Sequence, residues 1–132
     1  MKTRINDICP FGPRLQHYWD RLTERERKMM LDEEGLFSLA LEAVALNIAD
    51  KTPGDVVVDA FCGAGGSSIG FARKGKRVVA IDNNARRLNM ARHNARLFVV
   101  EGSIEFIYGD CRDLISTLKA DTVFLDPPLG RD

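Results

Sequence analysis

The chain has 132 residues, of which 45% are hydrophobic, and this length predicts one domain with a single core. Lysine plus arginine equal aspartate plus glutamate at 19 each, so no overall basic charge is available to attract long nucleic acids. No apolar run approaches the length needed to cross a membrane, and the N-terminus lacks the apolar stretch of a secretion signal, so we expect a soluble protein without membrane contacts.

The N-terminal part of the chain predicts a short arm followed by helices. Residues 1–13 contain two prolines and a glycine without periodicity, which indicates an irregular arm. From residue 14 to about residue 30, apolar residues recur at helical spacing, and the charged residues of the second half are expected to form a solvated face. The sequence Asp32-Glu-Glu-Gly35 interrupts the pattern, and Ser38 is the predicted N-cap of a second helix that runs through Asp50.

The middle of the chain predicts a nucleotide-binding turn. Residues 56–58 are all valine, which is typical of a strand buried on both faces of a parallel sheet, and this run ends at Asp59. Three glycines between residues 63 and 66 then allow a tight turn and a close approach of a ligand to the backbone. Residues 67–74 are predicted to form the helix that follows.

The carboxylate of Asp59 indicates which ligand this turn binds. A dinucleotide turn presents backbone N–H groups and a helix N-terminus to a pyrophosphate, and a neighbouring carboxylate disfavours that ligand. S-adenosylmethionine carries an ammonium and a sulfonium group but no phosphate. Ser68 also stands where the dinucleotide signature has its third glycine. We therefore predict S-adenosylmethionine as the cofactor; NAD, or a glycine turn that binds no ligand, are the alternatives.

Two further predicted strands also end beside acidic residues. Residues 77–82 form an apolar run that ends at Asp82, where a carboxylate can accept hydrogen bonds from both ribose hydroxyls; a role in capping the next helix is the other interpretation and does not exclude this one. Residues 103–108 alternate as a strand does. After them, Asp110 can accept from an adenine amino group, and the Cys111 N–H can donate to a ring nitrogen.

The fourth predicted strand leads into a motif with catalytic potential. After a short helix over residues 112–120, residues 121–125 form a strand that delivers Asp126-Pro-Pro128 to the end where open α/β sheets place their active sites. The prolines fix the backbone, so the Asp126 carboxylate and the Pro127 carbonyl can each accept a hydrogen from one exocyclic amino group. Such acceptors orient the nitrogen for an in-line displacement without a covalent enzyme intermediate. A stiff turn without a role is the alternative.

No metal site is predicted. The three cysteines, Cys9, Cys62 and Cys111, form no Cys-x-x-Cys pair, and His17 and His93 are isolated in the sequence. Cys62 is expected to be a small packing residue rather than a nucleophile, and the free thiols fit a reducing compartment.

Several segments together resemble the trimethylguanosine synthase family. The resemblance spans about residues 18–130 and lies in residues 55–66, 78–82, 91–95, 104–110 and 118–128, with residues 32–38 similar to a segment before the family's core. It implies a class I S-adenosylmethionine-dependent methyltransferase with a three-layer, Rossmann-like α/β sheet of strand order 3-2-1-4. It also implies methyl transfer to the guanine N2 of 7-methylguanosine caps on RNA of the snRNA or snoRNA type, in the nucleus and/or the cytoplasm.

These expectations define the predicted domains and site residues. The methyltransferase core is expected over residues 51–132, after the arm of residues 1–13 and a helical extension over residues 14–50. The predicted catalytic residues are Asp126, Pro127 and Pro128. The predicted cofactor-binding residues are Asp59, Phe61, Cys62, Gly63, Gly65, Asp82, Asn83, Asp110 and Cys111.

Two departures from the family affect the prediction. The family carries Ser-Pro-Pro-Trp after its fourth strand, and the tryptophan stacks on the methylated base; here Asp126 keeps the acceptor role, and Leu129 offers no π face. The family's fold continues through three more strands. We therefore expect a chain truncated after the fourth strand, either a fragment or a short form that makes a homodimer through that strand's exposed edge.

Other interpretations of the sequence stay open. The substrate could be a guanine of ribosomal or transfer RNA, or the chain could be an inactive module that binds the cofactor or RNA. Within the helical extension, Arg25, Arg27 and Lys28 could contact RNA instead of solvent. Trp19 is expected to anchor packing rather than to stack on a base.

Overall fold

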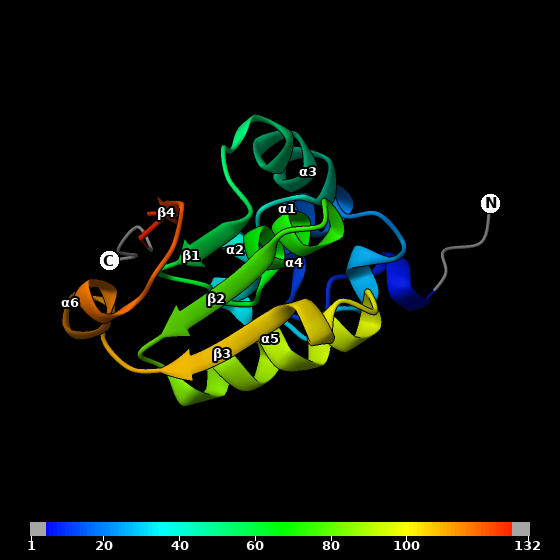
Figure 1. Cartoon of the computed structure of the whole chain (residues 1–132). Coiled ribbons are helices and arrows are strands. Elements are labelled where there is room, and N and C mark those ends of the chain that lie inside the picture. Colours follow the sequence, from blue (N-terminus) through cyan, green and yellow to red (C-terminus); the bar gives the residue numbers. More distant parts are fainter. Residues whose placement is uncertain (1–4, 128–132) are drawn as a thin grey trace.

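The computed structural model describes residues 5–127 and is built around a four-stranded parallel sheet with the order β3-β2-β1-β4 (Figure 1). The strands are β1 (Val56–Asp59), β2 (Arg77–Asp82), β3 (Ile104–Tyr108) and β4 (Thr122–Phe124). Val57 pairs with Val78 of β2 on one side and with Thr122 of β4 on the other. Because every pair is parallel, all four carboxyl ends lie at the same edge of the sheet. The predicted strand order is confirmed.

Successive residues of the central strand enter different cores. Val57 belongs to the larger hydrophobic cluster together with Ile69 of α4 (Gly66–Arg73) and Leu88 of α5 (Ala85–Leu97), so these two helices cover one face of the sheet. Val58 belongs to a smaller cluster with Cys111 of α6 (Cys111–Leu114) on the other face. The uninterrupted apolar sequence of β1 follows from this burial on both faces.

Helix α5 has one apolar face, which packs against the core, and one charged face. Its inward residues Leu88, Ala91 and Ala95 are buried, and Arg86 and Arg96 are exposed. The N-cap is Asn84, whose side-chain Oδ1 accepts from the Arg87 N–H at 3.2 Å. Asp82 is therefore not the N-cap of this helix; its Oδ1 accepts from the N–H of the N-cap residue at 2.9 Å.

The long helix predicted from residue 14 to about residue 30 is wrong. Helix α1 (Gln16–Asp20) ends after five residues, and a separate 3-10 turn covers Glu26–Lys28. Thr23 and Glu26 form a capping box that starts this turn: the Thr23 N–H donates to Glu26 Oε1 at 2.8 Å, and the Glu26 N–H donates to Thr23 Oγ1 at 3.1 Å. The reciprocal bonds satisfy N–H groups that a continuous helix would use internally.

Glu26 also explains why the N-cap predicted at Ser38 is wrong. Ser38 is the last residue of α2 (Glu33–Ser38), and α3 (Glu42–Lys51) has no side-chain cap of its own. Glu26 is only 2% exposed, and its Oε2 accepts from the Glu42 N–H at 2.8 Å, so it caps α3 from another segment. Its charge therefore belongs to the interior rather than to the predicted solvated face.

The segment Asp32-Glu-Glu-Gly35 starts a helix instead of interrupting one. Asp32 is the N-cap of α2, and its Oδ1 accepts from the Gly35 N–H at 2.6 Å. Glu33 and Glu34 lie in the first turn, where negative charge favours the helix dipole.

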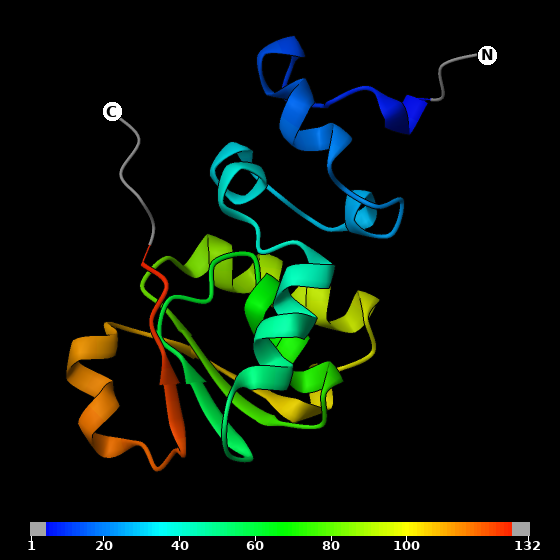
Figure 2. The same cartoon turned by 90° about the horizontal axis from the view of Figure 1, so that it is seen from above.

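Specific polar contacts hold the N-terminal helices, which lie to one side of the sheet in Figure 2, against the rest of the molecule. Asn94 of α5 is fully buried and is central to this attachment. Its Oδ1 accepts from the Met30 N–H at 2.6 Å, and its Nδ2 donates to the Met30 carbonyl at 3.0 Å and to the Ala64 carbonyl at 2.9 Å. Asn94 thus ties the N-terminal region to the glycine turn. Trp19 is buried as predicted, and its indole N–H donates to the Asn6 carbonyl at 2.7 Å.

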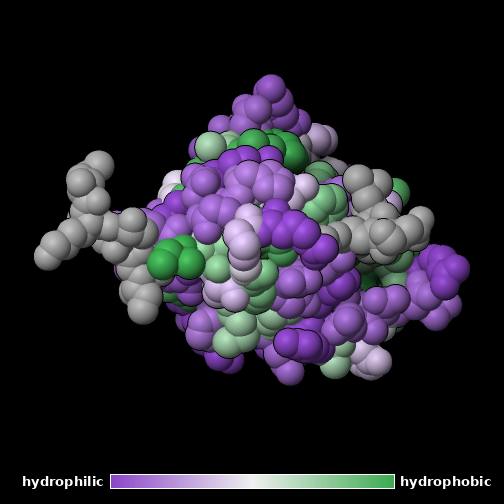
Figure 3. Space-filling model, turned by 180° about the vertical axis from the view of Figure 1, so that it is seen from behind, coloured by the Kyte–Doolittle hydropathy of each residue, from purple (hydrophilic) through white to green (hydrophobic). Residues whose placement is uncertain are grey.

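The face of the molecule drawn in Figure 3 is mostly polar. Hydrophilic residues cover most of the face seen in Figure 3, with apolar residues in small groups between them. Within residues 5–127, no helix has the length and apolar character needed to cross a membrane. Val123 and Leu125, in and after β4, are exposed. A homodimer through this edge stays a prediction.

Candidate functional site

The turn after β1 is closed by its glycines. Gly63 and Gly65 have φ angles of +53° and +95°, a region that side chains with a Cβ rarely adopt. The Gly65 N–H donates to the Cys62 carbonyl at 2.8 Å, and Gly65 is the N-cap of α4. A Cβ on Gly66 would lie 2.9 Å from the Ala40 carbonyl oxygen. The glycines therefore let the turn close tightly and let the N-terminal region approach its backbone.

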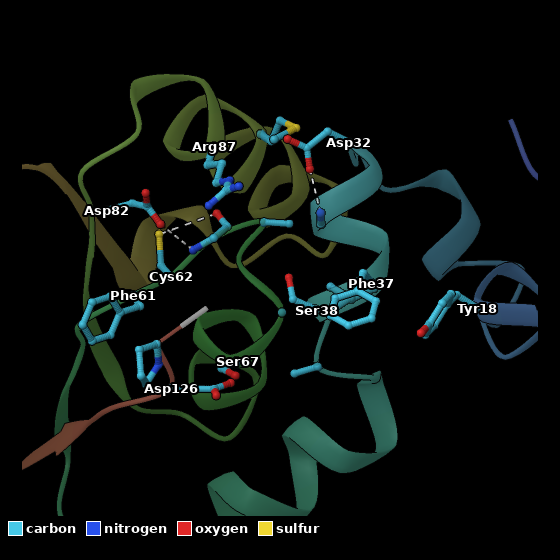
Figure 4. A pocket seen from close by; sticks show the side chains of 18 of the residues that line it. Tyr18, Asp32, Phe37, Ser38, Phe61, Cys62, Ser67, Asp82, Arg87 and Asp126 are labelled. Atoms are coloured by element: carbon cyan, nitrogen blue, oxygen red, sulfur yellow. Dashed lines mark hydrogen bonds between the residues drawn. The ribbon is translucent and has the colours of Figure 1, made fainter. Parts of the chain in front are cut away.

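A cavity of about 360 Å³ lies between this turn and the N-terminal helices (Figure 4). This volume is within the range of small-molecule sites. Its walls come from the carboxyl edge of the sheet, the glycine turn, α1 and α2. The residues that line it include Tyr18, Arg21, Asp32, Phe37, Ser38, Phe61, Cys62, Gly63, Ser67, Asp82, Arg87, Asp126 and Pro127.

Asp82 connects the ends of neighbouring strands at the cavity wall. Its Oδ2 accepts from the Gly63 N–H and its Oδ1 from the Asn84 N–H, both at 2.9 Å. Each carboxylate oxygen keeps a second lone pair, so Asp82 can still accept hydrogen bonds from a ligand. Asn83 is exposed and is not among the residues that line the cavity.

Asp59 lies beneath the turn rather than on the cavity wall. It is 1% exposed; its Oδ2 accepts from the Ser68 hydroxyl at 2.6 Å, and its Oδ1 has no partner of good hydrogen-bond geometry among the described residues. Burial raises the pKa of Asp59 from 3.8 to about 6, against the lowering effect of the Ser68 hydroxyl and the Phe61 amide. The nearby charges of Asp126 and Asp82 add to the rise.

Burial also determines the role of Cys62. Desolvation, together with the charges of Asp59 and Asp82, raises the pKa of the Cys62 thiol far above its usual value. A thiol that keeps its proton is a poor nucleophile. This agrees with the predicted packing role of Cys62. As a separate observation, no cluster of potential metal ligands occurs within residues 5–127.

The loop after β3 is adjacent to this site but does not line the cavity. The Gly109 N–H donates to the Asp82 carbonyl at 3.0 Å, which places Asp110 beside the end of β2. Asp110 caps α6 and pairs with Arg112, whose guanidinium lowers the pKa of that carboxyl to about 2. The helix predicted over residues 112–120 is correspondingly short, with α6 followed by a 3-10 turn over Ile115–Thr117. Adenine contacts of Asp110 and Cys111 stay predictions.

Asp126 and Pro127 reach the same cavity as the glycine turn. Asp126 follows β4, and Figure 4 shows its side chain between Phe61 and Ser67, which come from the turn and the start of α4. Two of the three predicted catalytic residues thus share a cavity with Asp82. Pro128 lies outside the described residues, as does Leu129.

The N-terminal helices form a wall of the cavity that was not predicted from the sequence. Tyr18, Phe37 and Ser38 line the cavity opposite Asp82 (Figure 4), and Arg21 lines it as well. Arg87 of α5 also reaches this cavity. The sequence signal for this wall is limited to two aromatic residues, Tyr18 and Phe37, about 20 positions apart. Such a spacing does not predict a contact unless the fold is known.

The donor set fits the cofactor predicted from the sequence. S-adenosylmethionine is positively charged at its ammonium and sulfonium groups. The site combines Asp82 on the cavity wall with Asp59 buried beneath it, and one oxygen of Asp59 has no hydrogen-bond partner within residues 5–127. Opposite charges within a partly buried site attract strongly, whereas a pyrophosphate would be repelled here.

Comparisons with known proteins agree with this chemistry. A family model described as "RNA cap guanine-N2 methyltransferase" matches residues 54–131. The trimethylguanosine synthase of Schizosaccharomyces pombe is 32% identical over an alignment of 138 positions, gaps included, that covers 93% of this chain and 57% of that protein. The tRNA (guanine(10)-N2)-dimethyltransferase of Methanothermobacter thermautotrophicus is 34% identical over 96 residues, which is 73% of this chain and 28% of that protein.

The fold also occurs in a solved methyltransferase. The tRNA (uracil-54, C5)-methyltransferase of Pyrococcus abyssi, crystallised with S-adenosyl-L-homocysteine, superimposes with a TM-score of 0.60 at 24% identity. The superposition covers 78% of this chain and 25% of that one. The predicted class I methyltransferase fold is confirmed, and the chain spans only part of each of these three proteins.

Proposed function

This chain belongs to the RNA cap guanine-N2 methyltransferase family, whose cofactor is S-adenosyl-L-methionine, and from that premise we propose that it methylates the exocyclic N2 of 7-methylguanosine caps on RNA of the snRNA or snoRNA type. The observation that carries the proposal is the shared cavity. Asp126 and Pro127, the acceptors for an amino group, line the same space as Asp82 and the glycine turn.

The protein's part in the reaction is to position its two substrates. Bound S-adenosyl-L-methionine supplies an electrophilic methyl group. The Asp126 carboxylate and the Pro127 carbonyl accept hydrogen bonds from the two N–H groups of the guanine amino group, which turns the nitrogen lone pair toward the methyl donor. The nitrogen loses one of these hydrogens as a proton when it gains the methyl group, and the Asp126 carboxylate is the group that takes this proton. Asp82 and Asp59 favour the positively charged cofactor, and burial keeps the Cys62 thiol protonated and inert.

A second candidate function is methylation of a guanine N2 in transfer RNA. The observation that favours it is the 34% identity to a tRNA (guanine(10)-N2)-dimethyltransferase, over 73% of this chain. The acceptor pair would work in the same way, because both candidates present the same amino group to Asp126. Only the surroundings of the base differ.

Radiolabelled S-adenosyl-L-methionine separates these functions when it is offered with 7-methyl-GTP, GTP or uncapped RNA. Labelling of 7-methyl-GTP and not of GTP supports the cap reaction, and labelling of uncapped transfer RNA alone supports the second candidate. Asp126→Ala should abolish transfer while it spares the affinity for S-adenosyl-L-homocysteine, because this side chain faces the acceptor. Turnover that persists in Asp126→Ala would remove its proposed role.

A further inference from the structure

Helix α5 carries positive charge on the side that points away from the core. Its 13 residues include four arginines and one histidine but no aspartate or glutamate. With 3.6 residues per turn, three of these arginines lie within an arc of roughly 120° around the helix. We call them the arginine face of α5; they are the exposed residues Arg86 and Arg96 and the half-buried residue Arg92.

The arginine face begins next to the cavity. Because β2 ends at Asp82 and α5 starts at Ala85, the first turn of α5 lies at the carboxyl edge of the sheet. In this turn Arg87 lines the cavity, and Arg86 is exposed outside it. The helix then runs beside β3 (Figure 1), and Arg96 lies about 15 Å from Arg86 along the helix axis. Positive charge therefore continues from the cavity along the outside of the molecule.

The arginine face has no acidic partner, unlike other arginines of this chain. Arg27 makes an ion pair with Asp7 at 3.0 Å, and the Arg25 guanidinium lies 4.4 Å from the centroid of the Phe98 ring. These two side chains thus hold the N-terminal region together. Within residues 5–127, no carboxylate forms an ion pair with any of the three members of the arginine face. Their charge is available to an external anion.

Strand β3 places an aromatic surface beside this face. Phe106 packs into the larger core, and the Arg92 guanidinium lies 5.7 Å from the centroid of its ring. Because side chains alternate along a strand, Tyr108 points to the same side of the sheet as Phe106, whereas Glu105 points to the side of the smaller core. Tyr108 is 64% exposed. Guanidinium groups and an exposed aromatic ring thus lie on one side of the molecule, and Glu105 is kept away from them.

An elongated face of unpaired arginines attracts a chain of phosphates. Guanidinium groups bind phosphate with two parallel N–H donors, and RNA carries a phosphate at every nucleotide. A membrane surface fits less well, because the apolar side of α5 is buried in the core and cannot enter a lipid layer.

We propose that the arginine face of α5 binds the phosphate backbone of the RNA substrate outside the cavity. A strand whose reacting base occupies the cavity continues past Arg87 and along this face. The inference rests on the proposed function in that the substrate is RNA. It adds affinity for the strand and not for the reacting base.

A long and a short substrate separate this face from the cavity. The long one is a labelled, 7-methylguanosine-capped RNA of about ten nucleotides, and the short one is 7-methyl-GTP. In fluorescence anisotropy with the chain saturated with S-adenosyl-L-homocysteine, Arg86→Ala/Arg96→Ala should bind the RNA about tenfold more weakly or worse. The slope of log Kd against log salt should fall by roughly 1.4, since two phosphate contacts are lost. Arg86→Lys/Arg96→Lys keeps both charges and should keep the slope.

Methylation kinetics give a second readout. The KM of Arg86→Ala/Arg96→Ala for the capped RNA should rise at unchanged kcat, because the contacts lie outside the reacting groups. Methylation of 7-methyl-GTP should be unchanged, because this substrate has no strand to lie along α5.

The control removes the same charge elsewhere. Lys51→Ala/Lys119→Ala changes two exposed lysines, in α3 and before β4, and should leave RNA affinity unchanged. All variants should bind S-adenosyl-L-homocysteine in calorimetry as the wild type does. Unchanged RNA affinity in Arg86→Ala/Arg96→Ala, or an equal loss in the lysine control, would overturn the inference. Binding to phosphatidylserine vesicles that the arginine variant alone loses, at unchanged RNA affinity, would assign the face to a membrane instead.

The two proposals fail in different ways. A wild-type chain that binds capped RNA without methylating it would overturn the proposed function, and the anisotropy comparison would still decide the role of α5. A wild-type chain that binds the cofactor but no RNA would overturn both.

Discussion

The sheet and the N-terminal helices contribute to one cavity but are stabilised in different ways. The sheet is held by continuous backbone pairing, and the side chains of β1 are buried on both faces. The N-terminal region consists of short helices and turns, and a few buried polar side chains, Glu26 and Asn94 among them, connect it to the sheet region. The acidic half of the site is therefore part of the core, whereas the aromatic half depends on how the helices dock.

Among the variants discussed here, loss of the Asn94 contacts should weaken the attachment of the N-terminal region to the sheet region the most. Asn94→Leu keeps the volume but leaves the Met30 N–H and carbonyl and the Ala64 carbonyl without their partner. We expect the free energy of unfolding to fall by about 3 kcal/mol, measured by urea denaturation. Hydrogen exchange should quicken in α1 and α2 more than in β1 and β2. Asn89→Leu, on the exposed face of the same helix, is the control.

Equal acceleration of exchange in the sheet and the N-terminal helices of Asn94→Leu would contradict this separation. It would mean that the two regions unfold as one cooperative unit.

Asp59→Asn tests the acidic core of the sheet region. The folded pKa of Asp59 is raised, to about 6, so its protonated form stabilises the fold below about pH 4, and this contribution is lost as the pH rises through about 6. The asparagine stays neutral. The stability of the variant relative to the wild type should therefore increase by on the order of 2–3 kcal/mol between pH 4 and pH 8. Denaturation curves across this range measure the difference, and a constant difference would refute the assigned pKa.

Helix α3 packs closely on α4 at Gly70, and a substitution there tests how tightly the two helices are held together. A Cβ on Gly70 would lie 2.8 Å from the Ala45 Cβ and 3.0 Å from the Ala45 carbonyl carbon. Gly70→Ala should lower the free energy of unfolding by about 1–2 kcal/mol, because overpacking outweighs the gain in helix propensity. Gly102→Ala meets no atom within 4 Å and should be close to neutral. A Gly70→Ala variant as stable as the wild type would show that α3 can shift freely.

The sheet region could be predicted from the sequence, whereas most of the N-terminal region could not. The strands, the glycine turn, Asp82 and Asp126 were predictable because each strand is an apolar run that ends beside an acid, and parallel strands bring those ends together. The N-terminal region was mispredicted because its contacts are not local. Glu26 caps a helix 16 residues away, and Asn94 binds a backbone 64 residues away. Helical periodicity carries no signal for such pairs.

Titration with S-adenosyl-L-homocysteine in a calorimeter measures whether acids at the carboxyl edge of the sheet hold the cofactor. Asp82→Ala removes a charge-assisted acceptor on the cavity wall and should weaken binding about tenfold or more. Asp50→Ala, at the exposed end of α3, should bind as the wild type does. Equal affinities of the wild type and Asp82→Ala would show that this acid does not hold the cofactor.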